Sequence, residues 1–117
     1  MVAVATTDNI VVNSHFGRAT HFQIIKMNQN SFAYEVIGSR DVSPVCHVGN
    51  HEREEMERRM DEFKDYQYIL VSRVGEMARN EIEKRGIEIY EIPGLIEESL
   101  YHLFTHLQVR NLISNAF

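Results

Sequence analysis

The stretch Val2-Ala3-Val4-Ala5-Thr6 decides the fold, because it is short, partly β-branched and almost entirely apolar. Such a run is typical of a central strand that is buried on both faces of a sheet. Residues 68–71, Tyr-Ile-Leu-Val, form a second run of this kind. A chain of 117 residues is long enough for one domain with one core. We therefore expect residues 1–117 to fold as a single α/β domain.

Three further strands and three helices follow from the patterns around these runs. Apolar segments at residues 21–27 and 32–37 flank the turn residues 28–31, which predicts an antiparallel hairpin. Residues 87–92 alternate strictly, as in a strand with one exposed face. Helices are predicted over about residues 50–64, 76–85 and 95–113, and the expected inward side chains are Met56, Met60, Phe63, Met77, Ala78, Ile82, Ile96, Leu100, Leu103, Phe104 and Leu107. The predicted fold is a mixed five-stranded sheet flanked by helices, in the order β-β-β-α-β-α-β-α.

Several residues mark where these elements begin and end. Asn50 is a plausible N-cap for the first helix, and Gly86 suits the position after the second helix. Pro93-Gly94 predicts a turn before the last helix, while Ile10-Val11-Val12 indicates a short edge piece.

The predicted topology brings three loops to one edge of the sheet. Strands one and three point the same way, and strand four follows a helical crossover, so it should lie parallel to strand one. The loops after strands one, three and four then share an edge, at the place where open α/β sheets bind ligands. The candidate site residues on these loops are His15, Phe16, Gly17 and Arg18, then Cys46, His47 and His51, then Ser72, Arg73 and Gly75.

Four of these residues have side chains that favour metal binding. Cys46-His47-x-x-x-His51 places one thiol and two imidazoles close together, and His15 would make a fourth ligand. Thiolate and imidazole are ligands for zinc, iron or copper. The spacing matches no closed zinc motif, so an exposed loop with an inert thiol is the alternative.

Ser72-Arg73-Val74-Gly75 indicates a modest anion site, with free N–H groups at a helix start and a cation beside them. The alternative is an ordinary turn between strand and helix, with a solvated Arg73.

Three other histidines favour structural roles. His21 lies at a strand start beside the first loop, where it is either structural or a part of the site. His102 and His106 are expected on the exposed face of the last helix, where they could at most form a surface metal pair.

Composition narrows the class of protein. The net charge of −5 argues against a nucleic-acid partner, and no apolar run is long enough to cross a bilayer. Residues 2–7 are too short for the apolar region of a signal peptide. The single cysteine, Cys46, cannot form an internal disulfide, which favours a cytoplasmic location.

Two other function classes are open on residues alone. A metal-dependent hydrolase or nuclease could use Asp8 and Asp41 with the histidines, and Cys46 with a nearby histidine could form a nucleophile pair. A small regulatory domain could bind a partner protein through its sheet edge or last helix. The loop edge holds cations and soft ligands rather than paired carboxylates, so we expect no enzyme.

The residues 2–6 leading to Ser14-His15-Phe16-Gly17-Arg18-Ala19, and then Phe22, resemble the opening of the dinitrogenase iron–molybdenum cofactor biosynthesis family. These are the NifX- and NafY-type domains, also found at the C-terminus of NifB. The likeness continues through residues 68–86 and covers nearly the whole chain. Two segments depart from it: the turn at residues 72–78 has less glycine and proline, and the Cys46 segment is not a family constant.

The resemblance implies a ribonuclease H-like fold and a non-catalytic carrier of the iron–molybdenum cofactor or its iron–sulfur precursor, working with cluster-assembly or acceptor proteins. It implies that His15 touches the metal cluster. Arg18 and Arg73 at the same edge suit an anionic cargo, and a zinc or iron ion is the alternative ligand.

Overall fold

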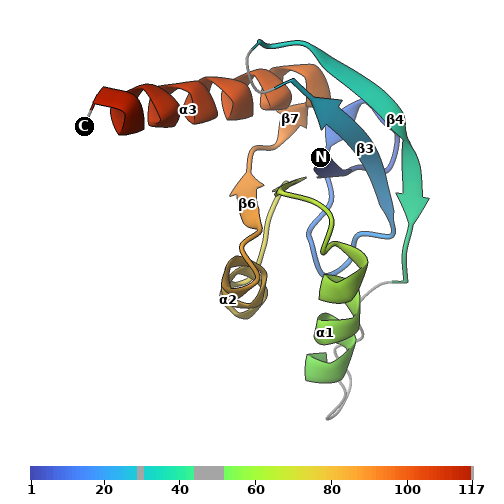
Figure 1. Cartoon of the computed structure of the whole chain (residues 1–117). Helices are drawn as coiled ribbons and strands as arrows, with labels where there is room; N and C mark the ends of the chain where they lie inside the picture. The colour runs from blue at the N-terminus through green and yellow to red at the C-terminus, as the bar shows by residue number, and fades with distance from the viewer. Residues whose placement is uncertain (29–30, 44–51, 117) are drawn as a thin grey trace.

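The computed structural model describes residues 1–28, 31–43 and 52–116. Five strands form a mixed sheet in the spatial order β4-β3-β1-β5-β6 (Figure 1). Their bounds are Val2–Ala5 for β1, His21–Met27 for β3, Tyr34–Asp41 for β4, Tyr68–Val71 for β5 and Glu88–Glu91 for β6. β1 pairs antiparallel with β3 and parallel with β5, β3 pairs antiparallel with β4, and β5 pairs parallel with β6. The predicted central strand and all of the predicted directions are confirmed.

Two short strands add a second sheet that the predicted order lacks. β2 (Val11–Val12) and β7 (Gly94–Leu95) pair antiparallel, with Val11 opposite Leu95. The edge piece expected near residues 10–12 thus exists, but its partner is the segment that was predicted to be only a turn. Gly94 has φ +119, a conformation that favours glycine, so the turn and the strand share this residue.

The helices are α1 (Glu52–Glu62), α2 (Glu76–Lys84) and α3 (Ile96–Ala116). Gly86 follows α2 with φ +78, as predicted. The predicted N-cap Asn50 lies outside the described residues. No helix in the described part of the chain is long and apolar enough to cross a membrane.

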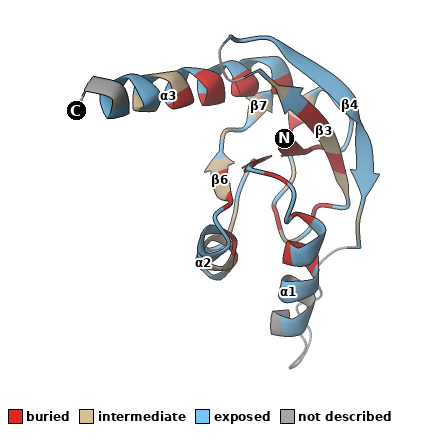
Figure 2. Ribbon diagram, in the orientation of Figure 1, coloured by how far each residue is buried: buried red, intermediate tan, exposed pale blue. Residues whose placement is uncertain are grey.

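The sheet is covered on both faces, and each face has its own apolar core. One core joins the sheet to Met60, Phe63, Ala78 and Ile82, from α1, α2 and the turn after α1. The other joins it to α3 (Figures 1 and 2), whose buried apolar residues are the five that the helical spacing predicted: Ile96, Leu100, Leu103, Phe104 and Leu107.

The prediction that Met77 faces inward is wrong, because half of its surface is exposed. Ala78 and Ile82, four residues apart, define the buried stripe of α2. Met77 precedes Ala78 by one residue and so lies about 100° around the helix from that stripe. Met56 lies in a part of α1 whose side chains are not described.

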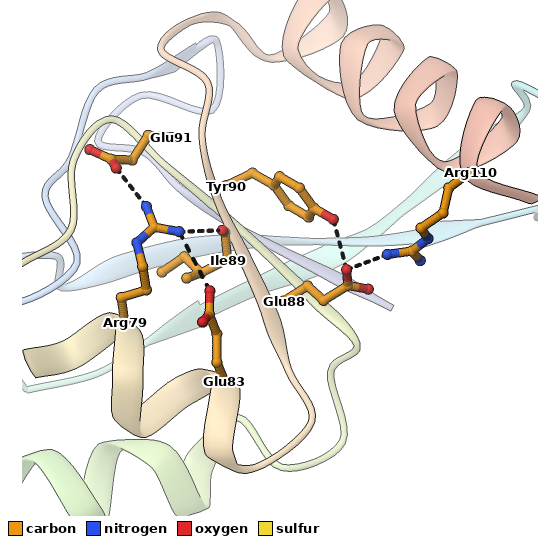
Figure 3. A network of polar contacts seen from close by, with 7 residues as sticks. All are labelled: Arg79, Glu83, Glu88, Ile89, Tyr90, Glu91 and Arg110. Atoms are coloured by element: carbon orange, nitrogen blue, oxygen red, sulfur yellow. Dashed lines mark hydrogen bonds and ion pairs between the residues drawn. The ribbon is translucent and has the colours of Figure 1, made fainter. Parts of the chain in front are cut away.

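Polar contacts hold β6 from both sides (Figure 3). Arg79 of α2 donates to the backbone O of Ile89 at 3.2 Å and pairs with Glu91 at 2.6 Å. On the other face, Glu88 accepts hydrogen bonds from Arg110 of α3 and from the Tyr90 hydroxyl. Burial and the bond to Glu88 raise the pKa of Tyr90 to about 12. The edge strand is thus tied to both helix layers.

Candidate functional site

The loop after β1 and the turn after β5 are joined by their backbones. Ser72 N donates to Ser14 O at 3.1 Å, and Phe16 N donates to Arg73 O at 2.9 Å. His15 and Arg73 form an isolated parallel bridge between these hydrogen bonds. The predicted convergence of these two loops is therefore confirmed, and it follows from the parallel pairing of β1 with β5.

Residues 15–19 form a single tight turn that separates two kinds of side chain. The N–H groups of Arg18 and Ala19 both donate to His15 O, at 3.2 and 2.9 Å. Phe16 is fully buried, and its ring centroid lies 6.1 Å from that of Phe63. His15 and Arg18 are exposed. Phe16 thus anchors the turn in the core while the two polar side chains face solvent.

Arg59 of α1 holds this turn in place, a role that was not predicted from the sequence. Its guanidinium is buried and donates to the backbone oxygens of Phe16, Ala19 and Ser43. The Arg59 carbon Cζ also lies 5.4 Å from the centre of the Phe16 ring. Burial lowers the pKa of Arg59.

One signal for Arg59 was present in the sequence. Arg59 lies four residues before Phe63 and one before Met60, so it borders the apolar stripe of α1. The neighbouring Arg58 is exposed. Helical phase could thus have separated these two arginines, but it could not have identified the three carbonyl groups.

A pocket of about 450 Å³ opens between the two joined loops and the start of α2. Its lining residues are His15, Phe16, Gly17, Arg18, Arg73, Val74, Gly75, Glu76, Met77 and Ala78. Six of the seven residues predicted to bind the cofactor thus lie around one cavity. The seventh, Ser72, lies just before this lining, and its buried Oγ has no hydrogen-bond partner among the described residues.

The charges at the pocket favour an anion. Arg18 and Arg73 are exposed at its wall, and Glu76 is the carboxylate there. α2 begins at the pocket, and its N-cap residue Gly75 has no side chain that could cap the free N–H groups. The positive end of the α2 dipole therefore adds to the two guanidinium groups.

The predicted metal ligands Cys46, His47 and His51 lie outside the described residues. The residues just before them lie next to the turn at residues 15–19, because Val42 N donates to Thr20 O at 2.8 Å and Ser43 O accepts from Arg59. Within residues 1–28, 31–43 and 52–116, no three His, Cys, Asp or Glu side chains are grouped as a metal site.

The carboxylates considered for hydrolysis make structural contacts. Asp8 Oδ1 accepts from the N–H groups of Ile10 at 2.9 Å and Val11 at 3.0 Å, and so orders the turn before β2. Asp41 Oδ1 lies 2.8 Å from His21 Nδ1, and His21 Nε2 lies 2.7 Å from Asn9 Oδ1. His21 thus ties β3 and β4 to this turn and is not among the residues that line the pocket.

The two histidines of α3 are exposed, as predicted. The ring of His106 lies 5.4 Å from that of Tyr90, measured between centroids.

Acid denaturation should report on Asp8. Hydrogen bonds from the N–H groups of Val11 and Ile10 lower the pKa of Asp8. A carboxyl group with a lower pKa in the folded state stabilises the fold above its unfolded pKa, and this stabilisation is lost as the pH falls through the folded pKa. We therefore expect Asp8→Asn to be less stable than the wild type at pH 7 and to lose less stability below about pH 4.

Urea unfolding at a series of pH values measures this difference. Asp65→Asn, which removes an exposed carboxylate from the turn after α1, serves as the control and should keep the wild-type slope. Equal slopes for Asp8→Asn and the wild type would contradict the role of Asp8.

Known proteins of one kind are similar to this chain over most of its length. A family model described as dinitrogenase iron-molybdenum cofactor matches residues 1–105. The FeMo cofactor biosynthesis protein NifB of Chlorobaculum tepidum is 25% identical over 115 residues, which are 98% of this chain and 26% of that protein. The NifB of Herbaspirillum seropedicae is 33% identical over 88 residues, covering 75% of this chain and 16% of that protein. The chain therefore spans about a quarter or less of the length of these relatives.

Two solved structures share the fold. The crystal structure of PH0822 aligns with a TM-score of 0.63 and 20% identity, covering 90% of this chain and 88% of the other. The NMR structure of a putative NifB protein from Thermotoga aligns with a TM-score of 0.52 and 21% identity, covering 90% and 86%. At these identities the likeness concerns the fold alone.

Proposed function

The chain belongs to the dinitrogenase iron–molybdenum cofactor family, and on this basis we propose that it is a non-catalytic carrier or accessory protein for a metal cluster. The cargo is the iron–molybdenum cofactor or its iron–sulfur precursor, and the fold is of the ribonuclease H-like kind. The whole of residues 1–117 acts as one such domain. Cluster-assembly or acceptor proteins in the cytoplasm donate and receive the cargo.

The observation that carries this proposal is the shared pocket of His15, Arg18 and Arg73. An imidazole at the wall supplies a ligand for an exposed iron or molybdenum site. Two guanidinium groups and the positive end of α2 compensate the negative charge of a sulfide-rich cluster. A volume of about 450 Å³ exceeds what a single metal ion occupies and suits a larger particle.

The neighbouring residues complete the proposed cradle. Gly17 and Gly75 let the backbone come close to the cargo, Phe16 closes the floor of the pocket, and Ser72 lies beside it. Cys46, His47 and His51 would add soft ligands from the third loop, and their part in the site stays a prediction.

The experiment that tests this function is anaerobic loading. The protein is incubated with iron and sulfide, or with isolated iron–molybdenum cofactor, and bound metal is measured by elemental analysis and visible absorption. We expect a coloured wild-type protein and a His15→Ala variant that binds the metal cluster roughly tenfold or more weakly. His102→Ala, an exposed histidine of α3 outside the pocket, is the control and should load like the wild type.

Three outcomes would contradict the proposal or a part of it. Colourless wild-type protein without metal would rule out a metal-cluster carrier. Binding of a single zinc or iron ion per chain, without sulfide, would mean that the ligand is a metal ion and not a metal cluster. Equal loading of His15→Ala and the wild type would remove His15 from the site.

A further inference from the structure

β4 is the outermost strand of the sheet, and its outer edge has no neighbour in the described part of the chain (Figure 1). All eight of its residues are exposed. They include Tyr34 at 39%, Val36 at 50% and Ile37 at 52% of full exposure. A long edge strand with exposed apolar side chains is a template for pairing with another strand.

An irregularity in β4 sets the direction of its charged side chains. Val36 pairs with Ile25 and Gly38 pairs with Ile24, so Ile37 is an extra residue in the strand. Glu35 is opposite Lys26, and Arg40 is opposite Phe22. Because their partners in β3 are four residues apart, Glu35 and Arg40 lie on the same face of the sheet. In a regular strand, two residues five apart would lie on opposite faces.

We propose that a second copy of this chain pairs with β4 in an antiparallel, two-fold arrangement centred on Gly38. In this register Glu35 of each copy lies opposite Arg40 of the other, and Val36 of each copy lies opposite Ser39 of the other. Side chains opposite one another in an antiparallel pair share a face, and opposite charges in such positions attract. This register depends on the extra residue Ile37, which takes no pairing position of its own. Val36 and Ser39 are therefore each one pairing position from Gly38, and Glu35 and Arg40 are each two positions from it.

The backbone and side chains of β4 have room for this pairing. A Cβ added at Gly38 would meet nothing within 4 Å, so the face of the sheet to which it would point is open at the centre of the strand. Arg40 uses one N–H group for the backbone O of Glu62, at 2.7 Å. A guanidinium has five N–H donors, so Arg40 keeps others for a carboxylate of the second copy.

The charge pattern favours a second copy over an unrelated strand. A two-fold axis satisfies both Glu35–Arg40 contacts with a single sequence, whereas another partner would need the same pattern by coincidence. The contact involves one strand from each copy, which is small for a stable interface. The dimer is therefore weak and depends on protein concentration. The dimer leaves the pocket at the ends of β1 and β5 open. The proposal of a dimer therefore does not rest on the proposed function.

Sedimentation equilibrium of the wild type and of two charge-reversal variants tests the dimer. We expect the wild type to associate with increasing concentration, and Glu35→Arg and Arg40→Glu each to weaken the association about tenfold or more through like-charge contacts. A mixture of the two variants restores both opposite-charge contacts, so it should associate like the wild type. Glu97→Arg, with the same change of charge on the exposed start of α3, should not differ from the wild type.

Circular dichroism and thermal unfolding establish that both variants are folded, which matters most for Arg40→Glu because Arg40 also bonds to Glu62. A wild type that stays monomeric at every concentration would overturn the proposal. So would single variants that associate like the wild type, or a mixture of folded variants that stays monomeric.

Discussion

Replacing Arg59 with methionine is expected to lower the free energy of unfolding by about 3 to 5 kcal/mol. Arg59 is 3% exposed, and its guanidinium donates to the backbone oxygens of Phe16, Ala19 and Ser43. Methionine fills much of the same space but donates no hydrogen bond, so these carbonyl groups lose their partner in a buried place. Chemical denaturation of the wild type and the variant measures the loss.

The chain offers two matched controls for Arg59. Arg58→Met makes the same change at an exposed neighbour on α1 and should alter stability by less than about 0.5 kcal/mol. Arg59→Lys keeps the charge but carries its donors on one nitrogen, whereas Arg59 reaches the three carbonyl groups from two nitrogens, so the stability of Arg59→Lys should fall between those of the wild type and Arg59→Met. A loss below about 1 kcal/mol for Arg59→Met would mean that the turn at residues 15–19 does not depend on this side chain.

Replacing Phe16 with alanine is expected to cost about 3 to 5 kcal/mol of stability. Phe16 is fully buried, and its ring packs against those of Phe22 and Phe63, at centroid distances of 6.5 and 6.1 Å. Alanine would leave a cavity directly below the pocket and remove the apolar anchor of the turn. The same denaturation experiment, with hydrogen exchange of the residue 18 and 19 amides, measures both consequences.

Phe32→Ala is the control for Phe16→Ala. Phe32 is 42% exposed, and its ring lies 5.3 Å from that of Tyr101 at the surface. Its loss should cost about 1 kcal/mol, because a partly exposed ring removes less apolar surface from water than a fully buried one. Similar losses at both positions would show that Phe16 does not anchor the loop.

Both residues act on the site through the fold, which separates them from His15. Arg59 and Phe16 hold the turn, while His15 and Arg18 on the same turn face the pocket. We therefore expect Arg59→Met and Phe16→Ala to lower stability first, and His15→Ala to weaken loading without a comparable loss of stability.

The sequence predicted which two loops come together at the candidate site, because this follows from the topology of the strands before them. The runs at residues 2–6 and 68–71 read as buried strands, and a helical crossover made them parallel neighbours. That pairing alone brings His15 beside Arg73, as the structure confirms. The contribution of Cys46, His47 and His51 from the third loop stays a prediction.

What the sequence determined by itself rests on local periodicity and local backbone preference. The stripe Leu100, Leu103, Phe104 and Leu107, the strand direction in the hairpin, and the positive φ of Gly86 each depend on residues close in the chain. Tertiary structure decided the pairing of β2 with β7 and the burial of Arg59 against the backbone oxygens of Phe16, Ala19 and Ser43. Each of these depends on partners far away in the sequence, whose positions exist only once the sheet and its helices have packed.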